Sequence, residues 1–340
     1  MINLLKFLLK RQRKRSKLAY TNTGFTLIEL LVGLVLASLV VTPLMGFMIN
    51  IMDNENKEKA KATSEQEIQA AIDFIAEDLK QAIYIYDPSG LDKTSSDTPP
   101  GIKDQIPPTE RAKVPGCRPE TPMCVPVLVF WKRELRPNVL KLTSSSNCPP
   151  PPSATANDCD DVYVYSLVAY YLVKGEISSG GWSDAARIAR FQIRDGFINP
   201  TILNNKEEPN NGFKLFDLAA TGVNLTEKMN RWTKNNDVPY DIVATARVLV
   251  DFIDQSPIST STLPSCPTGT QRVPSTTAFP TNLPGFFYVC VNSSNTSVQV
   301  FIRGNALARL EKNTIYSANK SIYFPTASIQ VKGLGLLGIE

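Results

Sequence analysis

The stretch KRQRKRSKLAYTNTGFTLIELLVGLVLASLVV, residues 10–41, joins a basic segment to a long apolar run. The apolar run extends from Phe25 to Met52 and contains one ionisable side chain, Glu29, close to its start. About 20 apolar residues in a helix are enough to span the hydrocarbon core of a bilayer. A carboxylate within hydrocarbon costs about 2.5–3.5 kcal/mol. We therefore expect a membrane-spanning helix in which Glu29 has a function that outweighs this cost.

The charges before the apolar run predict its orientation. The basic residues nearest to it are Lys10, Arg11, Arg13, Lys14, Arg15 and Lys17. Basic flanks stay in the cytoplasm, so the chain after about residue 53 is expected across the membrane. A secretory signal peptide fits less well, because its apolar region has about 7–15 residues and ends in a small-residue cleavage site. A plain signal anchor would leave Gly24 and Glu29 unexplained.

The composition of the chain argues against several classes of function. The 340 residues carry a net charge of +4, and the body is close to neutral without the basic leader, so nucleic-acid binding is not expected. The chain contains no histidine, which excludes Ser-His-Asp and Cys-His catalysis and histidine metal sites. No glycine-rich loop with the spacing of a phosphate cradle follows a predicted strand. We expect neither an enzyme nor a cofactor.

Residues 24–30, GFTLIEL, resemble the start of type IV prepilins. The shared pattern is a basic leader, a glycine, an aromatic residue, and a glutamate at the fifth position after the glycine. The resemblance implies that prepilin peptidase removes residues 1–24 by cutting between Gly24 and Phe25, and methylates the new amine of Phe25. It also implies that residues 25–52 form the transmembrane and filament-core helix. There Glu29 would neutralise the amine of a neighbouring subunit and mark the register of assembly.

Pro43 and Gly46 are expected to weaken this helix, because proline lacks a backbone donor and glycine has extra backbone freedom. Many major pilins have a proline at the place of Gly46, so the position of a melted or kinked segment is open. An ordinary kink of a membrane helix is the alternative.

A second helical segment is predicted for residues 53–86. Apolar residues recur at steps of three and four, and they are Ile68, Ile72, Ile75, Leu79, Ile83 and Tyr86. We expect one helix from Phe25 to Tyr86, roughly 90 Å long, which Asp87, Pro88, Ser89 and Gly90 end. Within it, AIDFIAEDLKQA resembles the corresponding helix of minor pilins and pseudopilins of the W and J type.

Residues 87–340 are expected to form a loop-rich, β-rich periplasmic domain. Residues 87–124 are predicted to be a long loop of functional or mobile character. Runs rich in valine, isoleucine and aromatic residues predict strands at Val125–Leu135, Val162–Lys174, Ala186–Arg194, Asp241–Asp254, Gly285–Asn292 and Ser297–Arg303. The tail after Asn305, with Gly333, Gly335 and Gly338, is expected to be loosely held. The fold class is therefore α+β, a long helix packed on a mainly antiparallel sheet, as in pilins.

Six cysteines lie after residue 100, which suggests an oxidising compartment. Six cysteines allow fifteen connectivities, and we favour near neighbours: Cys117 with Cys124, Cys148 with Cys159, and Cys266 with Cys290. A metal site is the competing interpretation, but no CxxC spacing occurs. Asp158, Asp160 and Asp161 form an acidic cluster that either binds calcium or is a solvated turn. We expect no other metal site.

These features together predict a non-enzymatic minor pilin or pseudopilin of a type IV pilus-like or type II secretion-like filament. The resemblance implies prepilin peptidase, other pilins and an inner-membrane assembly platform as partners. It also implies a bacterial inner-membrane location before entry into a periplasmic or surface filament. The layout is similar to pseudopilins of the cyanobacterial hormogonium polysaccharide secretion system, which suggests export of a polysaccharide or protein. Two alternatives are a pilus subunit for motility, adhesion or DNA uptake, and a membrane-anchored periplasmic binding protein.

Overall fold

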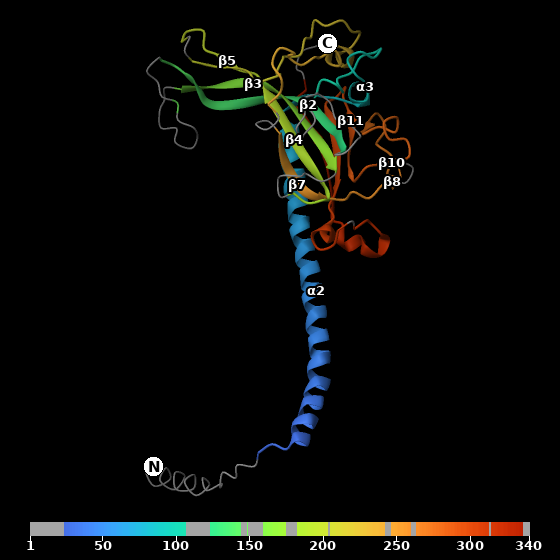
Figure 1. Cartoon of the computed structure of the whole chain (residues 1–340). Helices are drawn as coiled ribbons and strands as arrows, with labels where there is room; N and C mark the ends of the chain where they lie inside the picture. Colours follow the sequence, from blue (N-terminus) through green and yellow to red (C-terminus); the bar gives the residue numbers. More distant parts are fainter. Residues whose placement is uncertain are drawn as a thin grey trace, which may run out of the picture. The chain divides into compact units, whose positions relative to one another are not determined.

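A computed structural model describes residues 24–106, 123–143, 148, 159–174, 182–202, 205–241, 246–259, 263–312 and 314–335 (Figure 1). The chain divides into two compact units, residues 1–55 and residues 56–340. The basic leader, Cys117, Asp158 and Gly338 lie outside the described residues. The architecture, one long helix followed by antiparallel β-sheets, is α+β as the sequence predicts.

Helix α2 spans Leu27–Lys80 and begins at a side-chain cap. The backbone N–H of Glu29 donates to the hydroxyl Oγ1 of Thr26 at 3.3 Å and to the Thr26 carbonyl at 3.1 Å. This threonine therefore satisfies one of the donors that every helix start leaves free. The helix continues without interruption through Pro43 and Gly46. The structure thus shows no melted segment at either residue.

The predicted end of the helix at Tyr86 is wrong. Helix α2 stops at Lys80, and Ile83 lies in strand β1, Ala82–Ile85, where Tyr84 pairs with Trp131 of strand β2. Aromatic and β-branched residues fit a strand as well as a helical stripe, so spacing alone could not separate the two. Asp87 does not end α2. It caps the short helix α3, Pro88–Leu91, by accepting from the Ser89 N–H at 2.9 Å.

The larger sheet has five antiparallel strands in the order β1-β2-β3-β4-β7. The strands after β1 are β2 Met123–Lys141, β3 Cys159–Lys174, β4 Ala186–Arg194 and β7 Ala246–Ile253. Strands β2 and β3 are longer than predicted, because their hairpin continues to the pair Lys141 and Cys159. Figure 1 shows β2, β3 and β4 running side by side, with β7 next to β4.

The smaller sheet has four strands in the order β13-β12-β11-β9. They are β9 Gln271–Val273, β11 Phe287–Asn292, β12 Ser297–Arg303 and β13 Thr326–Lys332. The expectation of a loosely held tail is wrong over its described part. Strand β13 pairs with β12 along its whole length, and Gly335 donates its N–H to the carbonyl of Ala82 at 3.1 Å.

The remaining elements are short. They are β5 Phe197–Ile198, β6 Lys206–Glu207, α4 Leu225–Met229, β8 Ile258–Ser259, β10 Asn282–Leu283, and the 3-10 helices η1 Ala306–Arg309 and η2 Ala318–Tyr323. Strands β5 and β6 pair with each other, as do β8 and β10. These elements lie in the connections between strands of the two main sheets.

The core of residues 56–340 joins the striped face of α2 to both sheets. Ile68, Ile72, Ile75 and Leu79 of the helix are all buried. The described part of the predicted loop 87–124 also belongs to this core, because Leu91, Ile102 and Ile106 are buried. That part is packed, and the sequence missed it because its apolar residues follow no period.

Two disulfides join cysteines that both lie in the described ranges. Cys148 is bonded to Cys159, and Cys266 is bonded to Cys290. Both are pairs that the sequence favours. Cys124 is also disulfide-bonded, while its favoured partner Cys117 lies outside the described residues.

Candidate functional site

The N-terminal part of α2 presents an apolar surface that no other described residue covers. Every residue from Gly24 to Met52 is exposed, and Phe25 and Leu27 have 80% and 84% of their surface accessible. Exposed apolar patches on this scale mark interaction or membrane surfaces. Among the described residues, α2 is the helix that is long and apolar enough to cross a membrane. This segment therefore requires lipid or other helices around it.

Glu29 lies in the first turn of this apolar segment. The positive end of the helix dipole favours a carboxylate there. Gly24, Phe25 and Thr26 precede the helix in non-helical backbone, so the predicted cleavage point lies just outside the helix. The structure thus brings the predicted processing residues and the carboxylate together within two turns of chain. Their roles in processing and assembly stay predictions.

Pro43 and Gly46 lie within the exposed helix, where proline removes one backbone donor. Just before them, the hydroxyl of Thr42 donates to the Ser38 carbonyl at 2.8 Å, and the hydroxyl of Ser38 donates to the Val35 carbonyl at 2.8 Å. The helix-weakening role of Pro43 and Gly46 stays a prediction for the assembled state.

The acidic cluster is described only in part. Asp160 and Asp161 lie at the start of β3, and the carboxylate of Asp161 accepts from the backbone N–H of Asn138 at 2.9 Å. Within the described ranges, no three His, Cys, Asp or Glu side chains come together to hold a metal ion. The calcium hypothesis depends on Asp158, outside the described residues.

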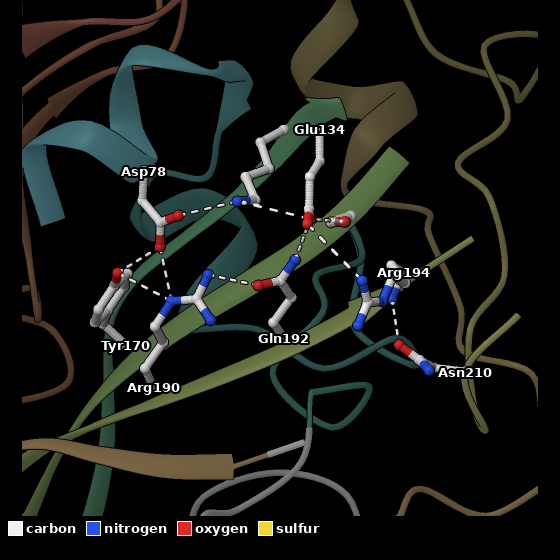
Figure 2. Close-up of polar contacts among 9 residues, drawn as sticks. Asp78, Glu134, Tyr170, Arg190, Gln192, Arg194 and Asn210 are labelled. Carbon is white, nitrogen blue, oxygen red and sulfur yellow. Dashed lines mark hydrogen bonds and ion pairs between the residues drawn. The ribbon is translucent and has the colours of Figure 1, made fainter. Parts of the chain in front are cut away.

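A buried polar cluster at the other end of α2 was not predicted. Figure 2 shows Asp78 pointing from the helix toward side chains of three strands. Its Oδ1 accepts from Lys132 Nζ at 3.0 Å, and its Oδ2 accepts from the Tyr170 hydroxyl at 2.6 Å and from Arg190 Nε at 2.7 Å. The Asp78 and Lys132 side chains are 8% and 6% exposed. One carboxylate thus ties the helix to β2, β3 and β4.

A second row of contacts holds the cations of this cluster in place (Figure 2). Arg190 Nη2 donates to Gln192 Oε1 at 2.6 Å, and Gln192 Nε2 donates to Glu134. Glu134 also accepts from the Ser166 hydroxyl at 3.0 Å and lies 3.7 Å from Lys132 Nζ. The cluster therefore satisfies its buried charges, as buried ion pairs require.

The electrostatics of the cluster favour the ionised carboxylate. Burial by itself raises the pKa of Asp78, but Arg190, Lys132 and Tyr170 together bring that pKa below its usual value. Burial and the charge of Asp78 raise the pKa of Tyr170 well above its usual value, so Tyr170 stays a neutral donor. The sequence held one signal for this site, because Asp78 lies three residues after Ile75 and so falls on the buried stripe.

A groove runs between the exposed face of α2 and strand β7. Its volume is about 720 Å³, and Glu67, Ala70, Ala71 and Phe74 of α2, Trp182, Ser183 and residues 248–252 line it. Phe74 and Trp182 are 46% and 44% exposed. The groove is a concave surface with aromatic walls, large enough for a small ligand.

Comparison with protein families matches residues 21–45 to the prokaryotic N-terminal methylation motif. Comparison with curated proteins finds no match, and comparison with solved structures finds none either. The matched residues include Gly24, Phe25, Glu29 and Pro43. The motif indicates a type IV pilin-like N-terminus, and it implies processing by prepilin peptidase and assembly with other pilins. The apolar, fully exposed start of α2 is consistent with membrane anchoring of such a protein.

Proposed function

We propose that this chain is a minor pilin or pseudopilin, a non-enzymatic subunit of a type IV pilus-like or type II secretion-like filament. In this proposal prepilin peptidase removes residues 1–24 and methylates Phe25. Residues 25–52 first hold the protein in the bacterial inner membrane, with the later residues in the periplasm. They then pack with the same helices of other subunits in the filament core.

One observation carries the proposal. The apolar surface of Gly24–Met52 is fully exposed, contains a single carboxylate in the first helical turn, and overlaps the matched motif at residues 24–45. A simple membrane anchor needs the apolar surface but gains nothing from Glu29. A helix bundle does gain from it, because a carboxylate paired with a neighbour's terminal amine costs less than either charge alone in a low dielectric.

Secretion is the use that we propose for the filament, with an exported polysaccharide or protein as the cargo. The support is the layout of the chain, which is similar to pseudopilins of the cyanobacterial hormogonium polysaccharide secretion system. A surface pilus for motility, adhesion or DNA uptake is the first alternative. A membrane-anchored periplasmic binding protein is the second, and the groove beside β7 is the observation that favours it.

Replacement of Glu29 by alanine separates a filament subunit from an anchor. We expect Glu29→Ala to be processed and membrane-inserted but to be lost from isolated filaments. Glu55→Ala is the matched control, because Glu55 is an exposed carboxylate of the same helix beyond the apolar run. Incorporation of Glu29→Ala into filaments at the wild-type level would show that charge pairing plays no part in assembly, whereas absence of the wild-type chain from filaments would favour the anchor.

Peptide mass spectrometry separates a pilus from a secretion filament. The target is a peptide that begins with N-methylated Phe25, sought in sheared surface filaments and in the membrane fraction. Its presence in sheared filaments would support the pilus, whereas its restriction to membranes would support a short periplasmic filament. An N-terminus other than Phe25 in both fractions would contradict processing at Gly24.

A further inference from the structure

Apolar packing on the buried face of α2 only partly defines the position of the helix along its own axis. Its large buried residues, Ile68, Ile72, Ile75 and Leu79, are similar in size and repeat at about one turn, and the smaller Ala71 and Ala76 are buried between them. A slide by one turn, about 5.4 Å, would bring each of these residues close to the place of the next. Apolar burial is non-directional, so part of it would survive that slide, although Ile75 would come to the place of the smaller Ala71.

Polar contacts are directional, and Asp78 provides the most deeply buried ion pairs of the described part of this face. Its three partners, Lys132, Tyr170 and Arg190, come from three consecutive strands of one sheet. Tyr170 and Arg190 lie directly opposite each other in the pairing of β3 with β4. Their side chains therefore meet the carboxylate from a fixed point of the sheet.

We propose that Asp78 is a positioning residue that locks the axial register of α2 on the five-stranded sheet. Through these contacts, a force applied along the helix axis is transmitted to β2, β3 and β4. The inference rests on the proposed function, because a subunit drawn out of a membrane by residues 25–52 is loaded along α2. Without such a lock, the helix would slide over its apolar contacts with the sheets at a lower force, instead of moving the domain with it.

A slide toward the N-terminus of α2 shows why the lock resists. One turn of movement would bring Ala82 to the place of Asp78, and Ala82 would first have to leave its pairing with Lys132. Lys132 and Arg190 would then lose their shared carboxylate while the sheet still buries them, with side chains 6% and 17% exposed. Removal of one partner from a buried ion pair is strongly unfavourable. The helix therefore cannot slide by one turn without breaking the ion pairs of Asp78.

A second polar contact, nearer the N-terminus of α2 than Asp78, also opposes a slide of the helix. Glu67 is ion-paired with Arg309 of η1, and the guanidinium of Arg309 lies 4.2 Å from the ring centroid of Phe252. Glu67 is the more exposed of the two acids, with 41% of its side chain accessible against 8% for Asp78. Asp78 is therefore expected to carry most of the lock.

The test separates a register lock from a general contribution to stability. The full chain is reconstituted in nanodiscs, and optical tweezers pull its two ends apart. Replacement of the three charges by apolar residues, Asp78→Leu with Lys132→Met and Arg190→Leu, should keep or raise the thermal midpoint, as in other buried ion clusters. In the same variant we expect loss of the single narrow force peak for detachment of α2, replaced by a lower and broader distribution.

Ile72→Ala is the matched control, because it leaves a cavity on the same buried face but keeps every contact of Asp78. It should lower the thermal midpoint and keep a narrow force peak. A narrow peak at the wild-type force in the triple variant would overturn the proposal. If the triple variant does not fold, Asp78→Asn replaces it. Its thermal midpoint should fall, because Lys132 and Arg190 lose their charged partner, and the width and height of its force peak then decide.

The pulling measurement uses the isolated chain, so it does not depend on filament formation. Absence of the wild-type chain from both surface and periplasmic filaments would overturn the proposed function and leave the register lock in place. A normal force peak in the triple variant would overturn the lock and leave the proposed function in place.

Discussion

At the scale of single residues, two carboxylates of one helix have opposite surroundings. Glu29 lies in an exposed apolar segment, whereas Asp78 is buried and bonded to three strands. Glu29 stands out in the sequence because an apolar run surrounds it. Asp78 is hidden among other charged residues of a polar segment, and only its place on the buried stripe distinguishes it. Position relative to the core, and not residue type, separates their roles.

The pH dependence of stability tests the state of Asp78. Its pKa is below the usual value in the folded protein, so the unfolded chain binds more protons near that value. Its contribution is therefore present above about pH 4 and is lost as the pH falls through the folded pKa. We expect thermal midpoints of Asp78→Asn to fall less steeply below about pH 4 than those of the wild type. Parallel curves for the two proteins would contradict an ionised, paired Asp78.

At the scale of elements, the sequence predicts strands better than it predicts their ends. Strands β4 and β12 match the predicted ranges, since alternating runs with clear boundaries define them. Residues 82–86 were predicted as helix because Ile83 and Tyr86 continue the helical spacing, and pairing with β2 overrides that spacing. Strand β13 was missed because its sequence, TASIQVK, is half polar and follows a poorly patterned tail. Long-range pairing, which a local pattern does not contain, decides both cases.

The close approach at Gly333 gives an element-scale prediction. A Cβ at this position would lie 2.4 Å from the Ala82 carbonyl oxygen, a backbone atom at the junction of α2 and β1. Gly333→Ala should therefore lower the free energy of unfolding by about 1–3 kcal/mol, measured by chemical denaturation. Lys332→Ala is the control, because Lys332 is the exposed last residue of β13 and directly precedes Gly333. Equal stability of the two variants would show that the junction adjusts without cost.

The disulfide between Cys266 and Cys290 gives a second prediction at this scale. It closes a segment with a sequence separation of 24 and holds the connection before β9 against β11. Replacement of both cysteines by alanine should cost about 3 kcal/mol of unfolding free energy, mainly through greater freedom of the unfolded chain. The same replacement at Cys148 and Cys159, whose separation is 11, should cost less. A larger loss at the shorter loop would contradict the loop-length argument.

At the scale of the whole molecule, the chain has an N-terminal segment that buries no residues, followed by a segment that forms a hydrophobic core. Residues 24–52 are exposed throughout, whereas the buried residues begin at Ala60. The sequence predicted this division, because one half of the long helix is apolar on all sides and the other half is striped. It could not predict that both sheets share one core with α2, because that arrangement depends on contacts between distant strands.

This division predicts different solubility for the two parts. The full chain should require detergent, whereas a chain that begins at Asn56 should remain in water and unfold in one transition. Detergent partitioning and circular dichroism on the two proteins check this. A chain that begins at Asn56 but aggregates or shows no cooperative unfolding would mean that the core depends on residues before it.

The pairing of β13 has a consequence for the order in which the protein can fold during synthesis. The ribosome makes α2 and β1 first, yet Val331 is part of the core that buries α2, and the N–H of Gly335 binds the carbonyl of Ala82. Contacts between such distant segments form slowly, because a long loop must close first. The newborn chain therefore cannot complete the core around α2 until its last strand has emerged. During that interval the chain would depend most on a chaperone and would be most readily cleaved by a protease.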